Sequence, residues 1–278
     1  MNERLEKQKQ AETEKKIKNK GKEKVVDVED ESETNERVQK QSFNRVLKGR
    51  ATVRPLFEAM RGLTPQRKRV VREMGFGNLI DFPIVEIPTK LAFYVVDILN
   101  TRKMMLECPM GDIVITPKTV KEVLGLPMGR RKLEREGQRE YNDPFLEEWK
   151  DQFKNINKLT IKALSDLIID TKNTDYMFRM NILTLIANTL GSCENSSCLK
   201  FTVLRNVFEG DDVSDIDWCS YIIECASVSK VDWSKTKKKK DVVYYGPVMF
   251  LMELYELIEE SIEEACDRIM AEIDREDQ

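Results

Sequence analysis

Four cysteines offer the first candidate chemistry, because thiolates are common ligands of structural zinc. Cys193 and Cys198 lie close together, and Cys219 and Cys225 follow about one helix later. The spacing is poor for zinc, since structural sites use closer pairs and the later two lie well round the axis of a predicted helix from each other. Buried, reduced thiols are the simpler interpretation. We therefore expect no metal and no other cofactor.

Acid–base and nucleophilic chemistry also lack their usual residues, because the sequence contains no histidine. This removes Ser–His–Asp and Cys–His catalysis and every histidine-containing zinc site. The adjacent carboxylates Asp211 and Asp212 fall in an acidic segment, where such groups are usually solvated. We predict no catalytic residue and a protein that is not an enzyme.

One candidate binding segment lies in the amino-terminal tail. It is a valine string followed by acids, made of Val25, Val26, Val28, Glu29, Asp30 and Glu31. This arrangement has the form of a SUMO-interacting motif, which adds a strand to the edge of its partner's sheet and sets its acids against basic residues. Short valine-and-acid strings also arise by chance in charged tails, so both interpretations stay open.

Basic clusters provide candidates for nuclear import or for contact with phosphates. The candidates are Lys15 to Lys24, Arg67 with Lys68 and Arg69, and the run that contains Lys237, Lys238, Lys239 and Lys240. Solvated surface is the alternative for each. Because the net charge is -3 and the pI about 5.5, the chain lacks the positive field of a dedicated nucleic-acid binder. Import is favoured, and with it a nuclear location; the cytoplasm is the alternative.

The first fifty residues are predicted to be disordered. They carry 14 Lys or Arg, 11 Asp or Glu and one aromatic residue, Phe43. So few large apolar groups cannot offset the entropy of ordering the backbone. No run of apolar residues is long enough to span a membrane, and no signal core follows Met1, so we expect an intracellular chain without a membrane partner.

Helical patterns dominate the sequence that follows. Capping residues and apolar periodicity predict helices over 63–74, 89–99, 117–124, 144–153, 161–170, 175–190, 198–208 and 216–228, with a last one from Pro247. Two β-branched runs, Met104 to Cys108 and Ile113 to Thr116, flank a Pro/Gly/Asp turn and predict a hairpin. Residues 130–142 show no periodicity and are expected to form a flexible excursion.

The last helix has an apolar seam on an acidic background. Its apolar positions alternate at spacings of four and three: Leu251, Tyr255, Ile258, Ile262, Ala265 and Ile269. From Glu253 to Asp277 there are 11 acids and 2 bases. The first half is expected to pack on its own domain, and the remainder would allow self-association or docking on a partner helix, as in a coiled coil.

These patterns predict a mainly α fold: one compact multi-helix domain with a short inserted β-hairpin, a disordered N-terminal tail and a long acidic C-terminal helix. The expected parts are a charged tail over 1–50, the helical domain over 56–256 and a helical extension over 257–278.

Six segments, taken in order, carry a resemblance to a known family: Met74 to Phe82, Ile87 to Asp97, Gly111 to Gly129, Ala187 to Cys193, Asp215 to Ile222 and Tyr244 to Tyr255. Together they resemble uncharacterised plant proteins related to the plant mobile domain, which occur in transposon-derived genes, often upstream of a SUMO-protease-like catalytic domain. The resemblance covers roughly residues 60–256. Catalysis by that protease needs a histidine, and this sequence has none. We therefore expect the catalytic domain to be missing here.

The function predicted from residues and resemblance together is a non-catalytic nuclear protein-interaction module of transposon-derived origin, linked to SUMO through the tail. The alternative is a DNA-associated accessory factor of a mobile element, which would use Arg67 to Arg72 and Lys235 to Lys240.

Overall fold

A computed structural model describes residues 45–47, 53–109, 111–154, 156–194, 198–236 and 243–276. At positions 235, 236, 262 and 265–276 the description covers the backbone only. Contacts divide the chain into residues 1–41 and residues 42–278, and all of the described residues belong to the second unit.

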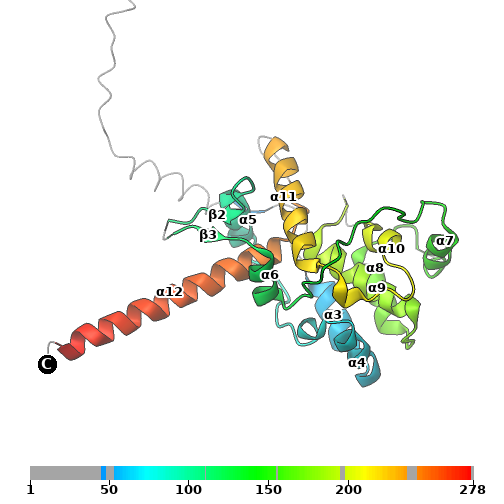
Figure 1. The fold of residues 1–278 in the computed structure, drawn as a ribbon, viewed down its shortest axis with the longest axis horizontal. Helices are drawn as coiled ribbons and strands as arrows, with labels where there is room; N and C mark the ends of the chain where they lie inside the picture. The colour runs from blue at the N-terminus through cyan, green and yellow to red at the C-terminus, as the bar shows by residue number, and fades with distance from the viewer. Residues whose placement is uncertain are drawn as a thin grey trace, which may run out of the picture. The chain divides into compact units, whose positions relative to one another are not determined.

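The fold is mainly helical with one small antiparallel sheet, as the sequence predicts (Figure 1). Its elements are α3 (Arg54–Gly62), α4 (Pro65–Glu73), the 3₁₀ turn η1 (Gly77–Leu79), α5 (Thr89–Ile98), β1 (Leu99–Asn100), β2 (Met105–Leu106), β3 (Ile113–Val114), α6 (Pro117–Leu124), α7 (Pro144–Asp151), α8 (Ile161–Asp170), α9 (Tyr176–Ile186), the π-helical turn η2 (Ala187–Gly191), α10 (Thr202–Asn206), the 3₁₀ turn η4 (Val213–Asp215), α11 (Trp218–Thr236) and α12 (Val248–Glu276).

The predicted hairpin is confirmed, and a third strand joins it. β2 pairs antiparallel with β3, with Leu106 opposite Ile113. β1 leaves the end of α5 directly and pairs with β2, with Leu99 opposite Leu106. Two residues are too few to give an alternating pattern, which explains why the sequence signal for β1 was missed.

Helix starts follow the capping residues. The Thr64 hydroxyl accepts from the backbone N–H of Arg67, and Thr116 and Thr119 form a reciprocal capping box at α6. At the other end of α6, Gly125 adopts φ 63°, where an added Cβ would lie 1.9 Å from Asn78 Nδ2. The sequence predicts both α4 and α6 closely because their signals are local.

Buried cations close two of the helices. Arg67 donates to the carbonyl oxygens of Ile168 (2.6 Å) and Thr171 (2.8 Å) at the end of α8, and its guanidinium lies 4.1 Å from the centre of the Phe178 ring. Lys230 of α11 donates to the carbonyl oxygens of Val96 and Asp97 at the end of α5. Each cation satisfies carbonyls that a helix end leaves without partners.

A third buried cation, Arg139, does the same for α10. It donates to the carbonyl oxygens of Leu204 (2.5 Å) and Val207 (2.6 Å). Its guanidinium lies 4.4 Å from the ring centre of Phe145 and 4.0 Å from that of Phe208. A segment without secondary structure is thereby tied to the end of a helix.

Residues 128–142, which we name the strap, include the stretch 130–142 that the sequence predicts to be a flexible excursion, but the strap is packed against the domain. Leu133 is buried, and backbone bridges join Met128 to Asp217 and Arg131 to Ile216. Gly129 lies so close to the next segment that an added Cβ would be 2.0 Å from the carbonyl carbon of Asp215. The contacts are all long-range, so no local periodicity announces them.

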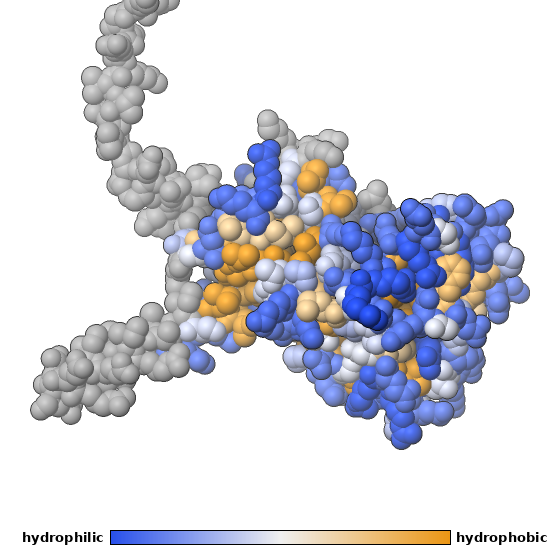
Figure 2. Space-filling model, viewed as in Figure 1, coloured by the Kyte–Doolittle hydropathy of each residue, from blue (hydrophilic) through white to orange (hydrophobic). Residues whose placement is uncertain are grey.

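The first part of the acidic helix packs on the domain, as expected. Leu251 is fully buried, and Tyr255 meets Tyr94 of α5 edge to face with 5.5 Å between ring centres. Figure 2 shows apolar surface over the sheet, α6 and the start of α12, where Val114 is 54% and Leu257 49% exposed.

Within the described residues, the helices are all too short or too polar to cross a membrane.

Candidate binding groove

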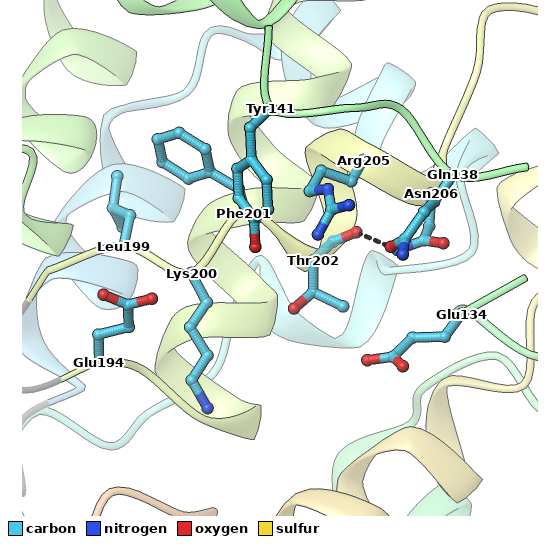
Figure 3. Close-up of a pocket in the computed structure, with 10 residues that line it drawn as sticks. All are labelled: Glu134, Gln138, Tyr141, Glu194, Leu199, Lys200, Phe201, Thr202, Arg205 and Asn206. Atoms are coloured by element: carbon cyan, nitrogen blue, oxygen red, sulfur yellow. Dashed lines mark hydrogen bonds between the residues drawn. The ribbon is translucent and has the colours of Figure 1, made fainter. Parts of the chain in front are cut away.

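An open groove of about 550 Å³ lies between the strap and the segment that leads into α10 (Figure 3). Its lining is polar and aromatic, and consists of Glu134, Gln138, Tyr141, Glu194, Leu199, Lys200, Phe201, Thr202, Arg205 and Asn206. Most of these side chains come from one short stretch, residues 199–206, so the position of that stretch decides the shape of the groove.

The stretch is held by the π-helical turn at the end of α9. Asn188 on this turn accepts from the backbone N–H of Lys200 (2.7 Å) and donates to its carbonyl oxygen (3.0 Å). The amide side chain of Asn188 therefore pairs with both backbone groups of Lys200, as the backbone of a neighbouring strand would. Turns of π-helix often occur at functional positions. Beneath the floor, Phe201 packs edge to face on the buried Trp149, with 5.5 Å between ring centres.

Tyr141 and Arg205 form the centre of the groove. The guanidinium carbon of Arg205 lies 4.0 Å from the centre of the Tyr141 ring, within the range of a cation–π contact. Tyr141 is nevertheless 66% exposed. A large aromatic side chain thus contacts a cation within the groove while most of its surface meets solvent.

Two reciprocal hydrogen bonds, one from a backbone N–H and one from a side chain, join the strap to α10. The N–H of Arg139 donates to the carbonyl oxygen of Arg205, and Nε of Arg205 donates back to the carbonyl oxygen of Arg139, both at 2.8 Å. Among the residues that the structure describes, the other contact of the Arg205 guanidinium is with the Tyr141 ring, and Nη1 and Nη2 form no hydrogen bond or ion pair. These nitrogens remain as donors for a ligand in the groove.

The charges of the groove follow a pattern. Figure 3 shows two cations, Lys200 and Arg205, between two carboxylates, Glu194 and Glu134. Lys200 Nζ donates to Ser192 Oγ at 2.8 Å, which leaves its remaining protons free to point outward. Both carboxylates are exposed, and neither has a cation within ion-pair distance in the part of the chain that the structure describes.

Cys193, Cys219 and Cys225 are buried, and Cys108 and Cys198 are half-buried. Burial raises the pKa of Cys219 to about 12, with a further contribution from Asp217. Burial also raises the pKa of Cys225, and raises that of Cys108 to about 11. In the described ranges, no three metal-ligating side chains gather in one place.

The basic cluster on α4 is corrected by the structure. Arg67 is 1% exposed and closes α8, so its guanidinium is not available to a nuclear-import receptor or to phosphates. Lys68 is half-buried and Arg69 is exposed. The helical period explains the error, since consecutive residues point about 100° apart around the axis and Arg67 is the one that faces the core.

Other predicted site residues lie outside the described ranges. These are the tail segment Val25, Val26, Val28, Glu29, Asp30 and Glu31, and the run Lys237, Lys238, Lys239 and Lys240. The groove was not predicted from the sequence. The one feature of the sequence that could have indicated the groove is the aromatic residue Tyr141 within the charged, aperiodic stretch 130–142.

Residues 49–252 match the family described as a domain of unknown function, DUF8566. The chain belongs to this family. The matched residues of DUF8566 include the whole groove, the strap and the three buried cations. No curated protein and no solved structure matches the chain.

Proposed function

We propose that this protein is a non-catalytic protein-interaction module whose folded domain binds its partner in the groove. The observation that carries the proposal is the exposed Tyr141 ring stacked on Arg205. Tyrosine and arginine are over-represented among the residues that dominate interface energies, particularly where packing holds them in one conformation. Here the partner would meet a surface that is already organised.

The chemistry of the groove supports binding over catalysis. Its lining contains no cysteine, and its one lysine already donates to Ser192. Elsewhere, burial holds Cys108 and Cys219 as thiols near neutral pH, and a thiol is a poor nucleophile. A second partner site in the tail, Val25 to Glu31, would join SUMO to the module by strand addition.

We also propose that the protein derives from a transposon-encoded protein and is located in the nucleus. The six segments that resemble proteins related to the plant mobile domain fall almost wholly within residues 49–252, so resemblance and family match concern the same domain. The proposal of a transposon-derived nuclear protein is supported by the resemblance and the basic clusters alone, since the family match carries no function. The alternative of a DNA-associated factor is weakened by the burial of Arg67, and depends on Lys68, Arg69 and Arg72 with Lys235 to Lys240.

Capture of partners from nuclear extract by the full chain tests the function. The three baits are the wild type, the groove variant Tyr141→Ala, and a chain that lacks residues 1–41, compared by quantitative mass spectrometry. We expect one set of proteins to be lost with Tyr141→Ala and SUMO conjugates to be lost with the tail. Capture of nucleic acid alone, or of the same proteins by all three baits, would contradict the proposal.

A further inference from the structure

We infer that the groove recognises a peptide segment in which an acidic residue stands between two basic ones. The inference rests on the proposed function and deepens it, because it gives the partner a charge pattern. It follows from the order of charges in the groove, where Lys200 and Arg205 lie between Glu194 and Glu134 (Figure 3).

The acidic residue of the partner belongs at the centre. Nη1 and Nη2 of Arg205 are unused among the described residues, and a guanidinium is shaped to bind a carboxylate through two nitrogens. Thr202 and Tyr141 contribute hydroxyl groups to the same part of the groove. A carboxylate here would receive charge-assisted hydrogen bonds, while an apolar neighbour of it would lie on the exposed face of the Tyr141 ring.

The basic residues of the partner belong at the two ends. Glu134 and Glu194 are exposed carboxylates without a described ion-pair partner, and the strap adds Glu136 and Glu140 next to Glu134. These acids repel a continuous polyanion such as DNA or RNA, and they repel a run of acidic residues as well. A single acid flanked by bases therefore fits the groove better than either.

Defined peptides of about twelve residues provide the probe, measured by fluorescence polarisation against the full chain. Each carries one central Glu next to a Trp, with one Lys on each side at varying distance. The matched controls have the same composition with both Lys residues on one side, and a third set inverts every charge. We expect at least one peptide of the first set to bind about tenfold more tightly than its control.

Groove variants assign the preference to these residues. Tyr141→Ala should weaken the best peptide several-fold, and the double variant E134K/E194K should transfer the preference to the charge-inverted set. All three positions are exposed, so the variants should melt as the wild type does. Equal binding by all sets, no binding by any, or a preference that survives the charge reversal would overturn the inference.

The same experiment separates this inference from the proposed function. If nuclear proteins are still captured through Tyr141 but the peptides show no charge preference, the module stands and the charge pattern is wrong. Competition by inorganic phosphate at concentrations that leave ionic strength unchanged forms a further arm. Complete displacement by phosphate, with no effect of acetate, would show a phosphate site and overturn the assignment of a carboxylate.

Discussion

The guanidinium of Arg67 lies over the Phe178 ring, 4.1 Å from its centre, and at the same time donates to the last carbonyls of α8. Burial lowers the pKa of Arg67, but an arginine keeps its charge under all ordinary conditions. The residue therefore joins α4, α8 and α9 through one charged group. Substituting Arg67 should therefore destabilise the fold, whereas substituting an exposed arginine of the same helix should not.

Replacing Arg67 with Met should lower the free energy of unfolding by about 2–4 kcal/mol, because the carbonyls of Ile168 and Thr171 would be left buried without this donor. Chemical denaturation measures the change. The matched control is Arg69→Met, two residues along the same helix and exposed, for which we expect a change within about 0.5 kcal/mol. Equal effects of the two variants would refute the assigned role.

The strap should loosen when Asp211 loses its charge. Its carboxylate accepts from Arg131 (3.4 Å) and from Arg135 (3.5 Å), in a partly buried position. Asp211→Asn should therefore weaken the attachment by about 1 kcal/mol, which is about fivefold in the opening equilibrium. Hydrogen exchange at the amides of Arg131 and Arg139 reports it, since both amides donate across to the neighbouring segment.

Asp212→Asn is the control for the strap, because the Asp212 carboxylate accepts from Ser214 in an exposed turn. It should leave exchange in the strap unchanged. The assignment of Asp211 as the anchor fails if both variants accelerate exchange equally, or if neither does.

Cys219 should resist alkylation in the folded protein. A pKa near 12 leaves about a thousandfold less thiolate at pH 8 than the ordinary value of 9.0 does, and burial adds a steric barrier. Iodoacetamide labelling followed by peptide mass spectrometry should find Cys219 modified long after the half-buried Cys198. In guanidinium chloride all six cysteines should react together, and early labelling of Cys219 without denaturant would contradict its placement.

The stability of the folded protein should depend on pH through Glu253 of α12. Burial raises its pKa above 4.5, and Glu256 and Glu260 raise it further. A carboxyl with a raised pKa favours the folded state when protonated, so its charged form costs stability at neutral pH and the cost disappears as pH falls toward 4.5.

Glu253→Gln should therefore raise the melting temperature by about 1 °C at pH 7, with a gain that shrinks as pH falls through the raised pKa. Thermal unfolding followed by circular dichroism across this range measures it. Glu263→Gln, exposed on the same helix, is the control. A gain that instead grows toward acid pH would show that the sign is wrong.

Local signals explain why much of the fold is predictable. Thr64 and Thr116 begin their helices as expected, and α8 occupies the predicted residues, because capping and apolar periodicity act within a few positions. The failures come from contacts between distant residues. Leu133 is buried, and Arg139 bonds to carbonyls 65 and 68 positions away, and nothing within the strap itself reveals either.

The groove was missed for the same reason. Tyr141 and Arg205 lie far apart in the sequence, and each alone is an ordinary surface residue. Arg67 shows the converse error, since its neighbours suggest an exposed cluster while its own partners lie about a hundred residues later. Charge and exposure are separate properties, and the sequence shows only the first.

The close approach of Gly129 to Asp215 bears on how relatives of this protein can vary. Any other side chain at position 129 would collide with a backbone carbonyl, so drift at this site should be blocked even where surrounding surface residues change freely. A DUF8566 relative with a larger residue at this position must have rerouted its strap, and would have inherited the helices without the groove.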